Sequence, residues 1–110
     1  MSFVNLNQLP FAGMSHEFIG EEHGAPISIY FVNAPPDRGP VLHTHPYVET
    51  VIVLEGCATL TVADQQREVK PGDVAVIPAG VAHRFVNTGN TDLRQIDIHA
   101  SPKFIQTDLA

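Results

Sequence analysis

The sequence predicts an all-β fold, a single sandwich or barrel, and three observations lead to this class. Short runs rich in β-branched residues recur along the 110-residue chain. Turn signals built from Gly, Pro, Asn and Asp separate these runs at short intervals. No window shows a convincing helical periodicity, and the best candidate, residues 104–109, is too short to form a helix alone. We expect one domain over residues 1–110, with its core at about 25–100 and peripheral segments at both ends.

The expected strands follow one another through this core. They cover residues 27–32, 51–54, 59–62, 74–77, 84–86 and 93–99. The first 25 residues are expected to add one or two peripheral strands, and residues 64–67 are interpreted as a hairpin loop. Gly56 and Gly80 suit backbone positions with positive φ, which other residues resist. Gly72 follows Pro71 in the order typical of a type II turn.

Composition and charge exclude several classes of function. The formal net charge is −6 and the six Lys and Arg residues are scattered, which argues against nucleic acid or an anionic membrane surface as a partner. No apolar run is long enough for a transmembrane helix, and the first residues lack a signal-peptide pattern, so we expect a cytoplasmic protein. The single cysteine, Cys57, cannot form an internal disulfide, so stability must come from packing or oligomerisation.

Four polar residues, His43, His45, Glu49 and His83, lie within or beside the apolar, strand-like segments. Side chains at positions i and i+2 of a strand share a face, so His43 and His45 point the same way, and Glu49 has the same parity. Three imidazoles and one carboxylate form a full set of protein ligands for one divalent transition metal, with Mn, Fe, Co, Ni, Cu and Zn all compatible. The absence of thiolate disfavours a structural zinc site. The competing interpretation is a buried polar network without a metal.

The spacing of these residues resembles the two motifs of the cupins. The first motif reads His-x-His, three residues, Glu, six residues, Gly; the second reads Gly, five residues, Pro-x-Gly, two residues, His, three residues, Asn. The nine matching positions are His43, His45, Glu49, Gly56, Gly72, Pro78, Gly80, His83 and Asn87. In one departure, Gly39 lies nearer to the first histidine than the motif's opening glycine usually does, which affects a turn and not a ligand. The resemblance covers about half of the chain and implies a small single-domain cupin, a jelly-roll β-barrel with a metal inside.

Other residues allow more than one interpretation. Val51, Val53 and Phe85 share parity with the metal ligands, so we expect them to line a pocket. The face of residues 93–99 that carries Gln95, Asp97 and His99 is interpreted as facing water or a subunit interface, and pocket lining by His99 is the alternative.

Six further residues are expected to have no part in the chemistry. Cys57 is interpreted as a small structural residue, because no base or positive charge that would activate a thiol is visible beside it in the sequence. His16 and His23 are expected to be solvated, because they lie among acidic residues near the N-terminus. Tyr30, Phe31 and Tyr47 are assigned to the core.

The four-ligand set suggests a chemistry for the pocket. Four protein ligands on an octahedral ion leave two positions free, and three neutral imidazoles with one carboxylate leave a net charge near +1. Such a centre suits a bidentate oxygen ligand, or one substrate oxygen together with O₂. The family resemblance favours a dioxygenase-like oxidoreductase acting on a small oxygenated molecule. A non-catalytic metal or small-molecule binding protein and a metal-dependent isomerase remain as alternatives. A homodimer is expected, because a small barrel has open strand edges that a second copy can cover.

Overall fold

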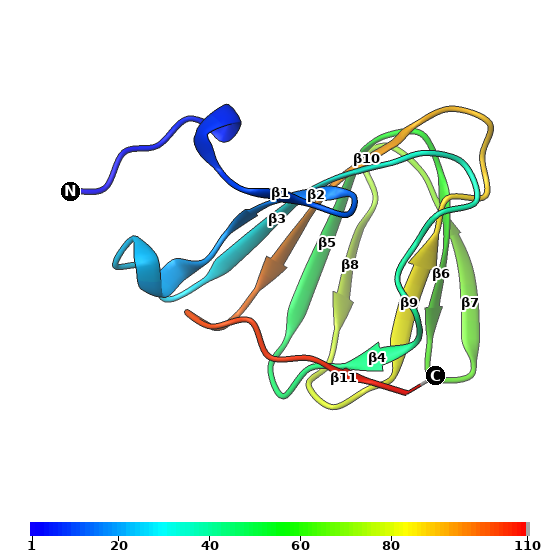
Figure 1. Cartoon of the computed structure of the whole chain (residues 1–110). Helices are drawn as coiled ribbons and strands as arrows, with labels where there is room; N and C mark the ends of the chain where they lie inside the picture. Colours follow the sequence, from blue (N-terminus) through cyan, green and yellow to red (C-terminus); the bar gives the residue numbers. More distant parts are fainter. Residues whose placement is uncertain (110) are drawn as a thin grey trace.

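The computed structural model describes residues 1–109 as two antiparallel β-sheets that face each other (Figure 1). The elements in chain order are the 3-10 helix η1 (Leu6–Gln8), β1 (Phe11–Ala12), β2 (Ser15–Phe18), the 3-10 helix η2 (Gly20–Glu22), β3 (Ser28–Ala34), β4 (His43–Thr44), β5 (Glu49–Glu55), β6 (Ala58–Val62), β7 (Gln65–Val69), β8 (Val74–Ile77), β9 (His83–Val86), β10 (Leu93–His99) and β11 (Thr107–Asp108). One sheet has the order β1-β2-β3-β10-β5-β8 and the other has the order β11-β4-β9-β6-β7. Neither helix is long and apolar enough to cross a membrane.

The structure confirms the all-β class and all six expected strands, which correspond to β3, β5, β6, β8, β9 and β10. Of the one or two peripheral strands expected near the N-terminus, the structure has two, β1 and β2. Gly56 and Gly80 have positive φ angles of 78° and 77°, as predicted. The turn at Pro71–Gly72 closes with a hydrogen bond from the Asp73 amide to the Lys70 carbonyl, 3.0 Å long.

The prediction of a hairpin loop at residues 64–67 is wrong, because most of that segment belongs to β7. This strand pairs with β6 from Val62 opposite Gln65 to Ala58 opposite Val69. Its first four residues are exposed and only Val69 is buried. The strand lies at the edge of its sheet and is paired to β6 through its backbone, and its exposed polar residues show none of the apolar alternation on which the sequence prediction depended.

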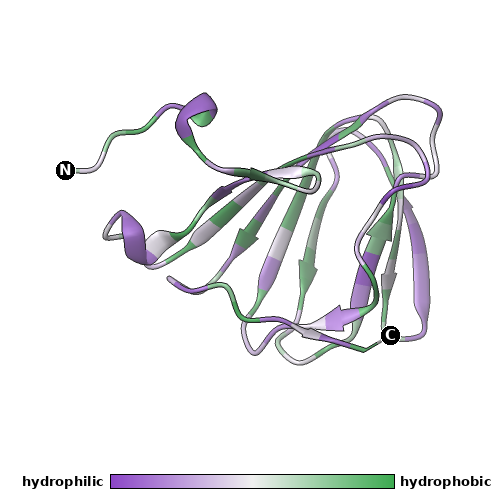
Figure 2. Cartoon of the chain, viewed as in Figure 1, coloured by the Kyte–Doolittle hydropathy of each residue, from purple (hydrophilic) through white to green (hydrophobic). Residues whose placement is uncertain are grey.

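Alternation along the strands places the hydrophobic core between the two sheets. In β5, Val51 and Val53 are buried, whereas Thr50 and Ile52 on the opposite face are half-buried. The buried core consists of Val32, Ala34, Val51, Val53, Ala58, Leu60, Val69, Ile77, Phe85 and Leu93. Figure 2 shows that β4 and part of β9 are hydrophilic, although they belong to the same two-sheet structure. Polar residues therefore gather where these strands meet.

The outer face of the six-stranded sheet is also apolar. On this face Ile96 of β10 lies between Ile52 of β5 and Phe31 of β3, and Ile98 pairs with Ile29. At the free edge of the sheet, Val74 and Val76 of β8 are 62% and 64% exposed. We call this surface the outer apolar face; its residues are Ile29, Phe31, Ile52, Val74, Val76, Ile96 and Ile98. Leu6 of η1 and Phe11 of β1 border it on the β3 side, where they line a hollow together with Phe31 and Ile96.

Residues 100–109, here named the C-terminal strap, run back across the open side of the barrel (Figure 1). Within the strap, β11 pairs with β4, where Thr107 lies opposite Thr44 and Asp108 opposite His43. The Leu109 amide donates a hydrogen bond to the Leu42 carbonyl, 2.9 Å long. The strap contains no helix at residues 104–109, and it links β10 of one sheet to the edge of the other.

Candidate metal centre

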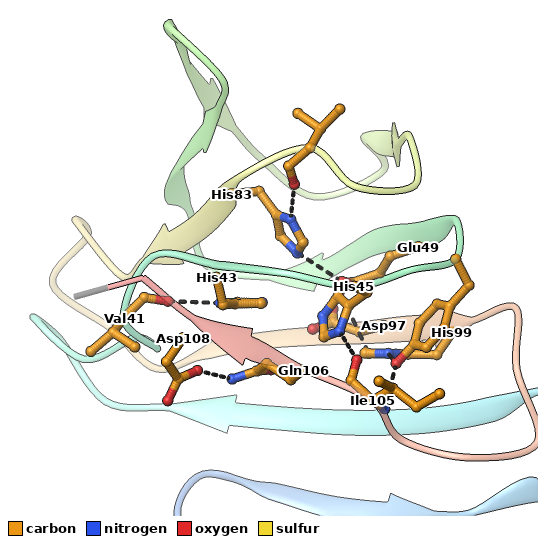
Figure 3. A network of polar contacts seen from close by, with 12 residues as sticks. Val41, His43, His45, Glu49, His83, Asp97, His99, Ile105, Gln106 and Asp108 are labelled. Carbon is orange, nitrogen blue, oxygen red and sulfur yellow. Dashed lines mark hydrogen bonds and ion pairs between the residues drawn. The ribbon is translucent and has the colours of Figure 1, made fainter.

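Three strands bring the four predicted ligands together at one end of the barrel (Figure 3). His43 begins β4, Glu49 begins β5, and His83 begins β9, while His45 follows β4 directly. His43 and His83 are register partners between neighbouring strands. All four side chains are buried, and one potential ligand atom from each lies within 4.8 Å of the others. Among the described residues 1–109, no second cluster of this kind is found.

Backbone carbonyl groups fix the orientation of the three imidazoles. The Nδ1 to carbonyl oxygen distances are 2.7 Å for His43 to Val41, 2.7 Å for His45 to Ile105, and 2.9 Å for His83 to Val81. A carbonyl can only accept a hydrogen bond, so each Nδ1 carries the proton. In a neutral imidazole, Nε2 then presents a lone pair, which is the form that binds a metal.

Glu49 completes the donor set. Its Oε1 lies 3.2 Å from Nε2 of His45 and 3.0 Å from Nε2 of His83. Burial alone would raise the pKa of Glu49, but hydrogen bonds with these two histidines outweigh burial and hold the pKa well below its usual range. Nitrogen lone pairs at such distances would repel an ionised carboxylate, so a positive charge must lie among these groups, either a bound metal ion or a proton on Nε2 when no metal is bound. The donor set therefore fits a divalent transition metal.

The charges of the other cluster histidines agree with this geometry. Burial lowers the pKa of His43, helped by the neighbouring histidines, so its imidazole stays neutral. Burial also disfavours a charge on His83, but the hydrogen bond to Glu49 outweighs burial and raises its pKa. A proton on His83 can thus take the place of the cation when no metal is bound, and metal binding must displace it.

Tyr47 and His99 form a second layer behind Glu49. The Tyr47 hydroxyl oxygen accepts a hydrogen bond from the Ile105 amide, 3.4 Å long, and lies 2.6 Å from Nδ1 of His99. Because an ionised Glu49 oxygen near Nε2 of His99 can only accept a hydrogen bond, we assign the His99 proton to Nε2, and the Tyr47 hydroxyl then donates to Nδ1. This N–H faces Oε2 of Glu49 at 3.7 Å. His99 is thus a neighbour of the carboxylate and not a fifth member of the cluster.

The interpretation of the polar face of residues 93–99 as solvent-facing is wrong. Gln95, Asp97 and His99 are only 1%, 5% and 3% exposed, because β10 lies in the middle of the six-stranded sheet and turns this face into the barrel. Asp97 accepts a hydrogen bond from Nε2 of Gln95, 2.8 Å long. Burial and the charge of Glu49 raise the pKa of Asp97 well above its usual range, which favours the protonated form, in which the carboxyl can donate a hydrogen bond.

A cavity of about 170 Å³ opens beside the cluster and exposes all four candidate ligands. Of the residues expected to line a pocket, Val51, Phe85 and His99 lie on its wall. Val53 does not, because it lies one inward-facing position farther along β5 and packs in the core. Sequence reasoning missed the other wall residues, which are Ala12, Gly13, Met14, Ser15, Tyr30, Val32, Pro40, Leu60, Ile77, Asp97, Phe104 and Gln106.

Three residues that were set aside in the sequence lie away from the cavity wall. His16 is half-buried, with Nδ1 3.1 Å from the Leu9 carbonyl oxygen, and His23 stacks on Phe18 with ring centroids 4.3 Å apart. The expectation that His16 and His23 are solvated is therefore wrong, because both side chains are half-buried. Cys57 is partly buried.

Residues 30–99, which make up more than half of the chain, match the family described as Cupin domain. The chain belongs to the cupin family. Solved structures share its fold: an oxalate oxidase in complex with the substrate analogue glycolate has a TM-score of 0.77 and 21% identity, and the match covers 86% of this chain and 54% of that one. A cupin-like protein from Thermotoga maritima has a TM-score of 0.78 and 24% identity, with coverages of 87% and 74%. The predicted cupin jelly roll is confirmed.

Two further relatives show how far the likeness extends. The oxalate decarboxylase of Lactobacillus farciminis, as a formate complex, has a TM-score of 0.82 and 24% identity, and the match covers 94% of this cupin and 34% of that chain. An uncharacterized protein of Streptomyces coelicolor is 36% identical over 59 residues, which are 54% of this chain and 55% of that protein. This cupin therefore spans about half the length of the curated relative that it matches.

The metal-free protein should lose stability as the pH falls from about 6.5 to about 4, because His99 is buried as a neutral group. Burial lowers its pKa from 6.5 to about 4. The unfolded chain binds more protons than the folded one in this window, so stability rises with pH across it. The contribution of His99 is about 3 kcal/mol, at about 1.4 kcal/mol per pKa unit, and it is fully present above the unfolded pKa. Urea unfolding of chelator-treated wild type and His99→Gln at several pH values measures it.

As the pH falls, the free energy of unfolding should decrease more steeply for wild type than for His99→Gln. His16→Gln is the control and should behave as wild type. Equal pH slopes for wild type and His99→Gln would contradict this assignment.

Proposed function

We propose that this cupin is a metal-dependent, dioxygenase-like oxidoreductase that acts on a small oxygenated molecule. One observation carries the proposal: three imidazole lone pairs and one ionised carboxylate converge on a single point that borders the cavity. A bound transition metal would supply activation of O₂ and of a substrate oxygen at this point. The similar structures named oxalate oxidase and oxalate decarboxylase support a small oxygenated ligand through their likeness in fold.

The residues around the cluster have separate roles in this proposal. His99, oriented by Tyr47, faces the second oxygen of Glu49 and helps to hold the carboxylate toward the histidines. Asp97, in its protonated form on the cavity wall, can donate a hydrogen bond to a substrate oxygen. Phe104 of the C-terminal strap packs against the rings of Tyr30 and His45 at centroid distances of 5.2 Å and 5.7 Å, which limits access of water.

The alternative is a non-catalytic protein that binds a metal or a small molecule, and the apolar character of much of the wall favours it. An isomerase that uses a redox-inert ion is a further alternative. Oxygen consumption separates these functions, because only the oxidoreductase uses O₂.

The experiment loads the metal-free protein with Fe, Mn, Ni or Cu and measures the bound metal by elemental analysis. Oxygen uptake and product formation are then followed with enediols, diketones and catechols. We expect uptake with at least one pair of metal and substrate, and none with metal-treated His45→Ala. Loaded protein that shows neither uptake nor turnover would overturn the proposed oxidoreductase and favour the binding protein.

We also propose that the protein is a homodimer in which two copies pack through the outer apolar face. Strands about 4.8 Å apart and residues about 3.3 Å apart give this face several hundred Å². A standard interface buries roughly 800 Å² per partner, so residues around the rim of this face would also have to take part. The face is apolar at its centre and carries the exposed Val74 and Val76 at its free edge. A second copy presents the same face, so it can cover both the apolar centre and the exposed Val74 and Val76.

Light scattering at tens of micromolar should therefore give twice the chain mass of 12.0 kDa. Val76→Lys should shift the protein toward the monomer, because it places a charge at the edge of the outer apolar face. Gln66→Lys, on the exposed edge strand of the other sheet, is the matched control and should leave the mass unchanged. A wild-type protein with the mass of one chain would contradict the dimer.

A further inference from the structure

We propose that the cavity selects a monoanionic oxygen chelator whose remaining part is apolar and uncharged, and that it rejects dianions. This inference rests on the proposed metal centre and names the class of molecule that the centre would accept. Three observations carry it: the places of the positive side chains, the charge of the donor set, and the chemistry of the cavity wall.

The cavity wall contains no Lys or Arg. All six Lys and Arg residues of the chain are exposed on the surface. They are Arg38, Arg67, Lys70, Arg84, Arg94 and Lys103. Two of them are within ion-pair distance of surface carboxylates, since Arg94 lies 3.8 Å from Glu55 and Lys103 lies 3.9 Å from Glu21. Within the described residues, therefore, no Lys or Arg on the cavity wall can neutralise an anionic group inside the cavity.

The donor set itself can balance only one further negative charge. The carbonyl partners of His43, His45 and His83 keep these imidazoles neutral when they bind a metal through Nε2. A divalent ion with the single carboxylate of Glu49 has a net charge of +1. A monoanionic chelator brings this sum to zero, whereas a dianion leaves an uncompensated negative charge in a buried site, which is costly. Oxalate is a dianion and falls outside the selected class.

The remainder of the ligand meets a largely apolar wall. Val32, Val51, Leu60, Ile77, Phe85 and Met14 line the cavity. The hydroxyl and amide groups on the wall belong to Ser15, Tyr30 and Gln106 and are uncharged, and the Asp97 carboxyl on the wall can add only negative charge. A second carboxylate or a phosphate on the ligand would lose its water on entering the cavity and would find no positive side chain there to compensate for that loss. The cavity volume of about 170 Å³ is below the roughly 300–1,000 Å³ of sites for drug-sized ligands, so the molecule must be small.

The test compares two ligands with the same chelating head and similar size. Both 2-hydroxypentanoate and malate offer a hydroxyl and an adjacent carboxylate, but the first ends in an alkyl chain and the second in another carboxylate. Each is titrated into the full-length protein loaded with Co²⁺, and binding is read from the visible absorption of the ion and by calorimetry. We expect 2-hydroxypentanoate to bind at least about ten-fold more tightly than malate, because malate adds a buried, unpaired charge.

A positive charge added to the wall should reverse this preference. Met14→Arg introduces one at a partly buried wall position, and Met14→Leu is its uncharged control. Ala12→Arg introduces one at an exposed wall position, where folding is less affected. We expect the ratio of the two affinities to move toward malate by at least about ten-fold in an Arg variant and to stay unchanged in Met14→Leu.

The outcomes separate this inference from the proposals on which it rests. The Co²⁺ content is measured before any ligand is added, and a protein that holds no Co²⁺ would overturn both the metal centre and this inference. Loaded wild type that binds malate as tightly as 2-hydroxypentanoate, or binds neither, would overturn this inference alone. The same would follow if both Arg variants held Co²⁺ and left the affinity ratio unchanged. These measurements do not involve oxygen uptake, so their outcome neither supports nor contradicts the proposed oxidoreductase activity.

Discussion

Replacement of His45 by alanine should reduce metal affinity by at least about 100-fold. Loss of a single partner of a metal ligand already costs about 10- to 100-fold, and this change removes a ligand itself. His45 is only 2% exposed, and its Nδ1 is fixed by the Ile105 carbonyl, so the change removes a buried ligand that is already oriented for binding. Elemental analysis of wild type and His45→Ala, purified together and dialysed against the same metal buffer, measures the effect.

His16→Ala is the matched control for this prediction, because His16 lies outside the cavity wall and the cluster. It should bind as much metal as wild type. Metal binding should also weaken steeply below about pH 6, because the imidazoles must be neutral to act as ligands. Equal metal content in wild type and His45→Ala would show that the four residues form a buried polar network without a metal.

Glu49→Gln should change the chemistry of the centre even where metal is retained. The glutamine keeps the shape of the side chain but removes the only negative charge of the cluster, so the net charge of a loaded centre rises from +1 to +2. We expect weaker metal binding by roughly 10- to 100-fold. We also expect an upward shift of any redox potential and a preference that moves from 2-hydroxypentanoate toward malate. Electrochemistry and the Co²⁺ titration measure the last two effects.

Glu55→Gln is the matched control, because Glu55 lies on the same strand but is exposed at its other end. It should leave the metal content, the potential and the ligand preference as in wild type. If Glu49→Gln with bound metal behaved as wild type in all three measurements, Glu49 would have no electrostatic role in the centre.

The candidate ligands could be predicted from the sequence because their spacing reflects strand parity. His43 and His45 point to one side by the two-residue repeat, and Glu49 continues the parity across Pro46. The contacts that fix the histidine tautomers could not be predicted in the same way. Ile105 uses its backbone carbonyl to hold His45, and a backbone group carries no signal of residue type.

Two strands show why other parts of the prediction were wrong. In β10 the alternation was read correctly, but the polar face was assigned to solvent, because apolar residues usually mark the buried side. Here both faces of the sheet are unusual: the inward face surrounds a polar centre and the outward face is apolar. In β7 the side chains of Gln65 to Glu68 are all exposed and only Val69 is buried, so the strand is held mainly by its hydrogen bonds to β6 and carries no alternating pattern in its sequence.

The C-terminal strap also has a consequence for the order of events during translation. His43, His45 and Glu49 leave the ribosome early, whereas His83 and the Ile105 carbonyl that orients His45 follow much later. A nascent chain that ends before residue 105 can expose the first three side chains but cannot fix the His45 imidazole through this contact. The pairing of β11 with β4 closes a long segment of chain, so loop-closure entropy opposes this contact and it cannot form until the strap has left the ribosome. Metal should therefore be acquired only after the strap has been synthesised.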